Sequence, residues 1–153
     1  GQELSGEIDV ERAKKLLIKA GLEKVMNAYP TSLSGGMKQR VAFIRALLSP
    51  QEIMCLDEPF SALDAFTKLD MQKWLLNIWE ADEKSILFIT HDIEEALFLS
   101  DKIIILSSDP AEIKNIITVP FPRPREENLL LSYDFLDLKK EVSKQIQNNY
   151  IEA

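Results

Sequence analysis

The stretch Ile53-Met-Cys-Leu-Asp-Glu-Pro-Phe-Ser-Ala-Leu-Asp64 decides the fold. Its first four residues are apolar without polar alternation, which is typical of a strand buried on both faces in a parallel sheet. Asp57 and Glu58 follow directly, and Pro59 then ends the strand because it has no N–H to donate. Open α/β sheets bind ligands at the carboxyl ends of their strands, so the two acids form a candidate site. The alternative is a strand that simply ends in a polar turn, and the flanking sequence decides between the two.

The bulk composition is that of one soluble globular domain. The chain has 153 residues, 46% hydrophobic and 28% charged, which is enough to bury a core. Its 25 acids outnumber its 18 bases, and the net charge of −7 argues against nucleic acid as the main partner. Cys55 is the only cysteine, so no internal disulfide can form. No apolar run approaches the roughly 20 residues that span a bilayer, so any work at a membrane requires docking on another protein.

The first third of the chain predicts two helices. Asp9 can cap a helix over 10–20, which carries an apolar stripe at helical spacing and is followed by a glycine. Ser34 can cap a second helix, which Pro50 ends. We expect the inward face of this second helix to carry Val41, Ile44 and Leu48.

The rest of the chain predicts strands that alternate with helices. In order these are a helix over 65–80, a buried strand over 85–90, a short helix after Asp92, strands over 103–106 and 113–119, and a last helix built on Phe135, Leu138, Val142 and Ile146. Asp92 and Glu95 have the spacing of a capping box. The pattern predicts an α/β fold with a parallel sheet and flanking helices.

Two further motifs flank the opening stretch: Leu33-Ser-Gly-Gly-Met-Lys-Gln-Arg40 precedes it and Thr90-His-Asp92 follows it. In this order and at this spacing, the three stretches resemble the ATP-binding subunit of ABC transporters. Residues 33–39 are similar to the family's signature motif, 53–58 to Walker B with the catalytic glutamate, 61–64 to the D-loop, and His91 to the switch histidine. The resemblance covers most of the chain. It implies the ABC-type fold of the P-loop NTPases, with part of a helical subdomain beside the sheet.

One family motif has no counterpart, because no G-x-x-x-x-G-K-[ST] phosphate loop occurs in the sequence. The chain therefore looks like the carboxyl-terminal part of such a subunit, and we expect it to be inactive alone. The resemblance divides it into three parts. Residues 1–50 are the end of the helical subdomain with the signature helix, 51–125 the Walker B, D-loop and switch-histidine part of the ATPase core, and 126–153 a C-terminal helical extension.

The resemblance implies ATP and Mg²⁺ as cofactors and gives the motif residues their roles. Asp57 is the expected metal ligand, since a strand-end carboxylate can hold the oxygen shell that Mg²⁺ prefers. Glu58 is the expected base that polarises the attacking water, and His91 is expected to hold the γ-phosphate and orient that water. The residues expected at the nucleotide are Leu33, Ser34, Gly35, Gly36, Gln39 and Asp64. The glycines open a helix, whose free N–H groups suit an anion.

These motifs also have plainer interpretations. A lone histidine at a strand end is usually a polar turn residue, and Ser-Gly-Gly is often only a loop that opens a helix. The joint occurrence of the motifs, in order, favours the ATPase.

The resemblance further implies partners and a place in the cell. Two such subunits pair head to tail, so each signature closes on the nucleotide that the partner holds, with Asp64 at the seam. The subunit docks on transmembrane permease subunits at the inner, cytoplasmic face of the membrane and serves an extracytoplasmic solute-binding protein indirectly. The stretches Asp57–Asp64 and Thr90–Leu97 look like those of importers, and Pro120-Phe-Pro-Arg-Pro-Arg125 resembles the nitrate, sulfonate and taurine group.

Two other functions are compatible with parts of the sequence. An ABC-type ATPase of DNA repair or chromosome maintenance carries coiled-coil or zinc insertions, whereas this chain has neither heptads nor cysteine pairs and is acidic. A non-catalytic interaction domain could keep the fold, but intact Asp57, Glu58 and His91 argue against such decay.

Overall fold

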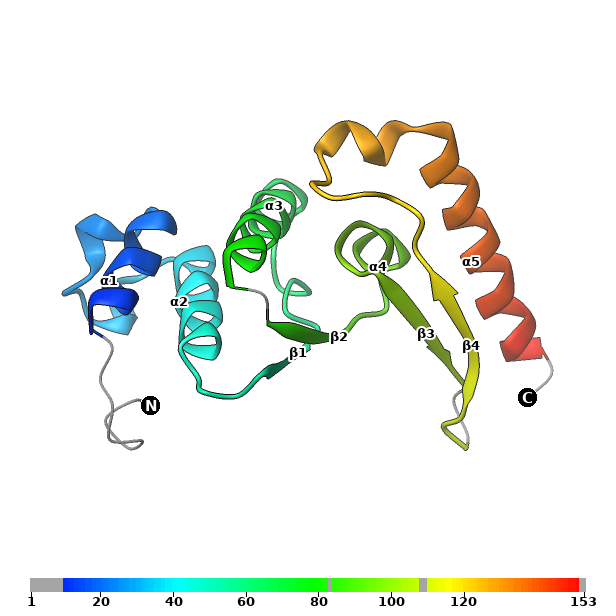
Figure 1. The fold of residues 1–153 in the computed structure, drawn as a ribbon, viewed down its shortest axis with the longest axis horizontal. Coiled ribbons are helices and arrows are strands. Elements are labelled where there is room, and N and C mark those ends of the chain that lie inside the picture. The colour runs from blue at the N-terminus through cyan, green and yellow to red at the C-terminus, as the bar shows by residue number, and fades with distance from the viewer. Residues whose placement is uncertain (1–9, 83, 108–109, 152–153) are drawn as a thin grey trace. The chain divides into compact units, whose positions relative to one another are not determined.

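The parallel pairing of β1 (Ile53–Asp57) with β2 (Ser85–Ile89) organises the first part of the chain in the computed structural model (Figure 1). The register joins Ile53 to Ser85 and Asp57 to Ile89, so the two strands end level with each other. The side chains of Met54 and Leu56 point to the face that α1 and α2 cover. The acids that follow β1 therefore lie at the carboxyl edge of this sheet.

The structure describes residues 10–82, 84–107 and 110–151, and the chain divides into two units, 1–89 and 90–153. The described elements of the first unit are α1 (Val10–Lys19), the 3-10 turns η1 (Glu23–Val25) and η2 (Pro30–Ser32), α2 (Gly35–Leu47), β1, α3 (Ala65–Asp82) and β2. Gly21 ends α1 with a φ of +70°, a value that glycine adopts without steric cost. The guanidinium of Arg40 donates to the carbonyl of Ala20 at 2.8 Å, which ties α2 to the end of α1.

One face of the two-stranded sheet is covered and the other is open. The covered face belongs to a core cluster made of Leu16, Ala20, Leu22, Ile44, Leu47, Met54 and Ile78. On the open face Ile53 is 62% exposed, and Cys55, Leu87 and Ile89 are exposed as well. The prediction that both strands are buried on two faces is therefore wrong for the described chain, because its helices α1, α2 and α3 supply cover for one face alone.

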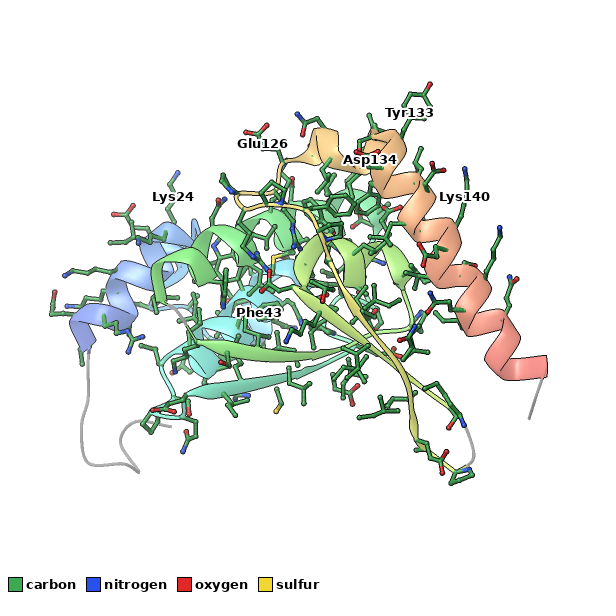
Figure 2. All side chains as sticks on the ribbon, turned by 45° about the vertical axis from the view of Figure 1, so that its right-hand side comes forward. Lys24, Phe43, Glu126, Tyr133, Asp134 and Lys140 are labelled. Atoms are coloured by element: carbon green, nitrogen blue, oxygen red, sulfur yellow. The ribbon has the colours of Figure 1, made fainter. Side chains whose placement is uncertain are left out.

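An aromatic cluster fills the space between α2, α3 and the sheet. The ring of Phe43 lies 5.6 Å from Phe60 and 6.0 Å from Trp74, and the ring of Phe60 lies 5.9 Å from Phe88. Phe43 and Phe60 are fully buried, and Figure 2 shows Phe43 inside the unit. Phe60 stands three residues after Asp57, so the cluster anchors the turn that carries the two acids.

The second unit packs two helices on a β-hairpin (Figure 1). Its described elements are α4 (Ile93–Leu99), β3 (Lys102–Leu106), β4 (Ile113–Thr118), the 3-10 turn η3 (Glu127–Leu131) and α5 (Tyr133–Ile151). β3 and β4 pair antiparallel, with a register shift between Ile105 and Leu106. The core of the unit comprises Leu97, Phe98, Leu99, Ile105, Val119, Phe135 and Val142. An ion pair between Lys139 and Glu94, at 2.6 Å, joins α5 to α4.

The predicted helices and strands are confirmed, with small differences at their ends. The inward face of α2 differs from the prediction: Val41 is 37% exposed, while Phe43 and Leu47 join Ile44 inside. The expected cap Asp9 lies outside the described residues. Across the described ranges, no helix combines the length and the apolarity that a membrane crossing needs.

We predict that Phe60→Ala lowers the free energy of unfolding of the first unit by about 3–5 kcal/mol, because it empties a buried aromatic site. Phe60 is 0% exposed, whereas Phe66, six residues later, is 88% exposed and provides a matched control. Phe66→Ala should change the stability by no more than about 0.5 kcal/mol. Urea unfolding followed by the fluorescence of Trp74 and Trp79, both on α3, measures the difference. Equal losses in the two variants would contradict the described core.

Candidate functional site

Asp57 and Glu58 lie exposed at the carboxyl end of β1. Asp57 is the last residue of the strand and pairs in register with Ile89. The amide of Glu58 donates to the carbonyl of Ile89 at 2.9 Å, which extends the ladder by one bond before Pro59 ends it. Both carboxylates are thus held on a backbone that two strands fix, at the edge where such sheets bind ligands.

Glu58 has a backbone conformation that L-residues rarely adopt. Its φ is +40°, in the left-handed region, which costs on the order of 1–3 kcal/mol for a residue with a side chain. Three contacts hold it there: the bond to Ile89, and two hydrogen bonds that its carbonyl accepts from the Ser61 amide at 3.2 Å and the Ser61 hydroxyl at 2.9 Å. Backbone strain of this kind concentrates at functional sites, where it gives a side chain a set direction.

The start of α2 is a candidate anion site in the first unit. Ser34 is the N-cap, and its hydroxyl accepts a hydrogen bond from the Met37 amide at 3.3 Å. The predicted cap is therefore confirmed. A Cβ built on Gly35 would meet no atom within 4 Å, so the backbone there faces open space. The free N–H groups of the first turn and the positive end of the helix dipole suit a phosphate.

Gly36 and Asp64 meet at one neighbour, Thr67. A Cβ on Gly36 would come to 3.4 Å from the Thr67 methyl, which is a tight contact with the first turn of α3. Asp64 caps that turn: its carboxylate accepts from the Thr67 amide at 3.1 Å and from the Thr67 hydroxyl at 2.6 Å. These hydrogen bonds lower the pKa of Asp64 below its ordinary value. The first turn of α2 and the turn at Asp64 thus share Thr67 as a neighbour. The sequence analysis missed this contact, because the spacing of Thr67 gave no signal.

Gln39 and Leu33 lie farther from open space. The side-chain amide of Gln39 donates to the carbonyl of Pro59, so it links α2 to the turn that carries Glu58. The amide of Leu33 donates to the carbonyl of Pro30 at 3.3 Å and its side chain is half-buried. Both residues therefore support the backbone on either side of the candidate anion site.

His91 belongs to the second unit and is exposed at the start of α4. Asp92, the N-cap of α4, accepts hydrogen bonds from the amides of Glu94 at 2.9 Å and Glu95 at 3.4 Å, which confirms the predicted cap. The Thr90 hydroxyl accepts from the Asp92 amide at 3.0 Å and donates to the Glu95 carboxylate at 2.8 Å. The structure brings Asp57, Glu58 and the signature residues together in one unit, and it does not bring His91 into that unit.

The residues present fit a metal held in part by this chain. In the described ranges, no group of three or more His, Cys, Asp and Glu side chains could hold a metal ion on its own. Mg²⁺ commonly takes one or two carboxylates and completes its shell with water and phosphate oxygens, and the exposed Asp57 carboxylate can supply one such ligand. The exposed Asp57 carboxylate could therefore supply one ligand of a metal ion whose remaining ligands come from elsewhere.

Residues 3–61 match the sequence family described as "ABC transporter". The chain is 46% identical over 127 residues to the aliphatic sulfonates import ATP-binding protein SsuB of Bacillus cereus, covering 83% of this chain and 48% of that protein. It is 50% identical over 112 residues to the nitrate import ATP-binding protein NrtD of Synechococcus elongatus, covering 72% and 41%. The solved structure described as a dimeric post-hydrolysis state of the ATP-binding cassette MJ0796, bound to ADP and Pi, has a TM-score of 0.57 at 35% identity, covering 73% and 47%.

These matches agree with the motif geometry of the first unit, and they confirm the resemblance and the α/β fold class inferred from the sequence. The chain belongs to the family of ABC transporter ATP-binding proteins. It spans about half the length of the relatives that it matches.

We predict that the cap of α3 titrates with Asp64. Because its folded pKa lies below the ordinary 3.8, the cap is complete above that value and is lost as the pH falls below it through the folded pKa. NMR of the Thr67 amide should show this loss, with faster hydrogen exchange at acid pH. Asp64→Asn is the control, since an amide caps without titrating. The same pH dependence in that variant would contradict the assignment.

Proposed function

We propose that this chain is part of an ATP-binding and hydrolysing subunit that powers an ABC-type importer. The observation that carries the proposal is the exposed Asp57–Glu58 pair, held at the carboxyl end of a parallel strand pair with Glu58 in a left-handed conformation. The capped, open start of α2 in the same unit supports it with a second phosphate-binding element. Family membership supports nucleotide as the ligand of both.

The residues divide the work by their chemistry. Glu58 accepts a hydrogen bond, and then the proton, from the water that attacks the γ-phosphate. An exposed carboxylate at a strand end can come within hydrogen-bonding distance of that water. Asp57 would hold Mg²⁺, which would draw charge from the phosphate oxygens. His91 donates to the γ-phosphate and orients the same water. The left-handed turn at Glu58 fixes the direction of the base before substrate arrives, so little reorganisation is needed.

The signature residues act on a nucleotide that a second copy of the subunit holds. The backbone at Gly35 faces open space, so a phosphate held by another copy can approach the first turn of α2. Leu33, Gly36 and Gln39 shape the backbone behind it. Asp64 then lies at the seam of the two copies and couples the two sites. The dimeric state of the MJ0796 cassette, with ADP and Pi bound, supports this arrangement.

Small anions are the proposed cargo. The relatives are named for the import of aliphatic sulfonates and of nitrate, and the stretch Pro120–Arg125 led to the same group, which includes taurine. The subunit would work in the cytoplasm, on the inner face of the membrane, docked to transmembrane permease subunits. A solute-binding protein outside the membrane delivers the anion to the permease, so the ATPase touches neither the anion nor nucleic acid.

We predict that Glu58→Gln in the full-length subunit that contains this chain lowers ATP turnover by about 10²–10⁴-fold, because the amide cannot take the proton from water. ATP should still bind and drive dimerisation. Turnover is measured by phosphate release and dimerisation by sedimentation. The matched control is Glu52→Gln, the same change at an exposed position before β1, which should keep normal turnover.

Near-normal turnover of the Glu58→Gln subunit would exclude Glu58 as the base. Loss of ATP binding in that variant would instead place Glu58 among the binding groups. Either result contradicts the role given to it here.

A further inference from the structure

Arg125 is a buried charged side chain of the second unit, with 1% of its side chain exposed. Its Nη1 donates to three carbonyls at one end of α4: Leu97 at 3.3 Å, Phe98 at 3.1 Å and Ser100 at 2.8 Å. Nε and Nη2 donate to the carbonyl of Phe121 at 3.2 and 3.1 Å. One guanidinium thus ties the end of a helix to the segment that follows β4.

Arg123 completes this cap from the same segment. Its Nη2 donates to the carbonyl of Leu99 at 2.7 Å, and its Nε pairs with the Asp101 carboxylate at 3.0 Å. The carbonyls of four consecutive residues, Leu97 to Ser100, therefore accept hydrogen bonds from two arginines. A helix end leaves such carbonyls without partners inside the helix, and its dipole favours positive charge there.

The surroundings of Arg125 disfavour its positive charge. Burial, and then the charge of Arg123, lower the pKa of Arg125, while Asp101 partly restores it. A charge buried in this way is retained only where its hydrogen bonds are well satisfied. Other helix ends do without a buried charge, since the backbone N–H groups that follow the helix, or water, can satisfy the same carbonyls. In the second unit, two arginines of the Pro-Arg-Pro-Arg stretch pair with these carbonyls.

His91 lies at the other end of α4, directly before the N-cap Asp92. The helix has seven residues, too few to hold its shape without outside contacts. Asp92 caps its first turn, and the Thr90–Glu95 hydrogen bond at 2.8 Å closes the same end. Contacts at both ends thus determine where α4 begins and how it is turned about its axis. His91 directly precedes the cap, so its backbone moves with the helix.

We propose that Arg125, assisted by Arg123, is a positioning residue: it clamps the carboxyl end of α4 and so sets the place of His91. This inference rests on the proposed function, in which His91 orients the attacking water. Arginine suits the role because its planar, forked donors reach several carbonyls at once, which a lysine ammonium cannot do in the same geometry. Arg125→Lys therefore keeps the charge and loses the clamp.

The first arm of the test uses NMR on the 153-residue chain. His91 is its only histidine, so one imidazole NMR signal reports on that residue. We expect Arg125→Lys to shift and broaden this signal and to speed the hydrogen exchange of the α4 amides about tenfold or more, with α5 amides unchanged. Arg123→Lys, at a less buried site, should do the same more weakly and serves if Arg125→Lys fails to fold. Lys140→Met, on the exposed side of α5, is the control (Figure 2).

The second arm measures ATP turnover in the full-length subunit. Arg125→Lys should lower kcat by about ten- to a hundredfold and leave KM for ATP within about twofold, because misplacement of a catalytic group affects the chemical step. Lys140→Met should change neither constant.

Four results separate the outcomes. An unchanged His91 signal together with unchanged kcat in Arg125→Lys would overturn the inference, and so would loss of exchange protection throughout α5, which would make the role purely structural. If His91→Ala keeps normal turnover, the role proposed for His91 is wrong, and the expected effect of Arg125 on kcat is contradicted with it. A shifted signal with lowered kcat and preserved α5 supports it.

Discussion

The hydrogen bond from the Glu58 amide to the Ile89 carbonyl, at 2.9 Å, is the constraint on which the candidate site depends. It closes the parallel register of β1 and β2 at the point where Glu58 turns left-handed and Pro59 ends the strand. Two further contacts hold the turn. Gln39 on α2 donates a hydrogen bond to the Pro59 carbonyl, and the ring of Phe60 is buried in the aromatic core. A strained backbone persists only where its surroundings hold it, and here a strand, a helix and an aromatic core do so together.

Local signals predicted much of this structure. The caps at Ser34 and Asp92, the stop at Gly21 and the ends of the strands depend on side chains within three or four residues, so the sequence shows them directly. The position of Asp57 and Glu58 directly after the apolar run predicted that they lie at the carboxyl edge of the sheet, and the strand register confirms this.

Long-range partners escaped prediction. The apolar run Ile53–Leu56 indicated a buried strand, but apolarity does not say which face the chain itself can cover, and one face proved open. The left-handed φ of Glu58 has no local signature, because the residue before a proline is usually extended. The sequence showed Arg125 only as part of a Pro-Arg stretch, whereas four of its contacts are with residues 24 to 28 positions away, at the end of α4 and directly after it. Such contacts follow from the tertiary fold and not from spacing.

A mixed dimer of full-length subunits tests the central claim, that the start of α2 acts on a nucleotide held by another copy. One subunit carries Gly35→Asp and the other carries a distinguishable tag. Gly35 is the informative position because a new side chain there meets no atom of its own chain, whereas Gly36 already touches Thr67. Photolabelling with an azido-ATP analogue then shows which subunit retains nucleotide in the closed dimer. The account predicts that the nucleotide held by the unmutated subunit is no longer enclosed, while the nucleotide held by the mutated subunit is still enclosed and retained. Loss at the nucleotide of the mutated subunit itself would contradict it.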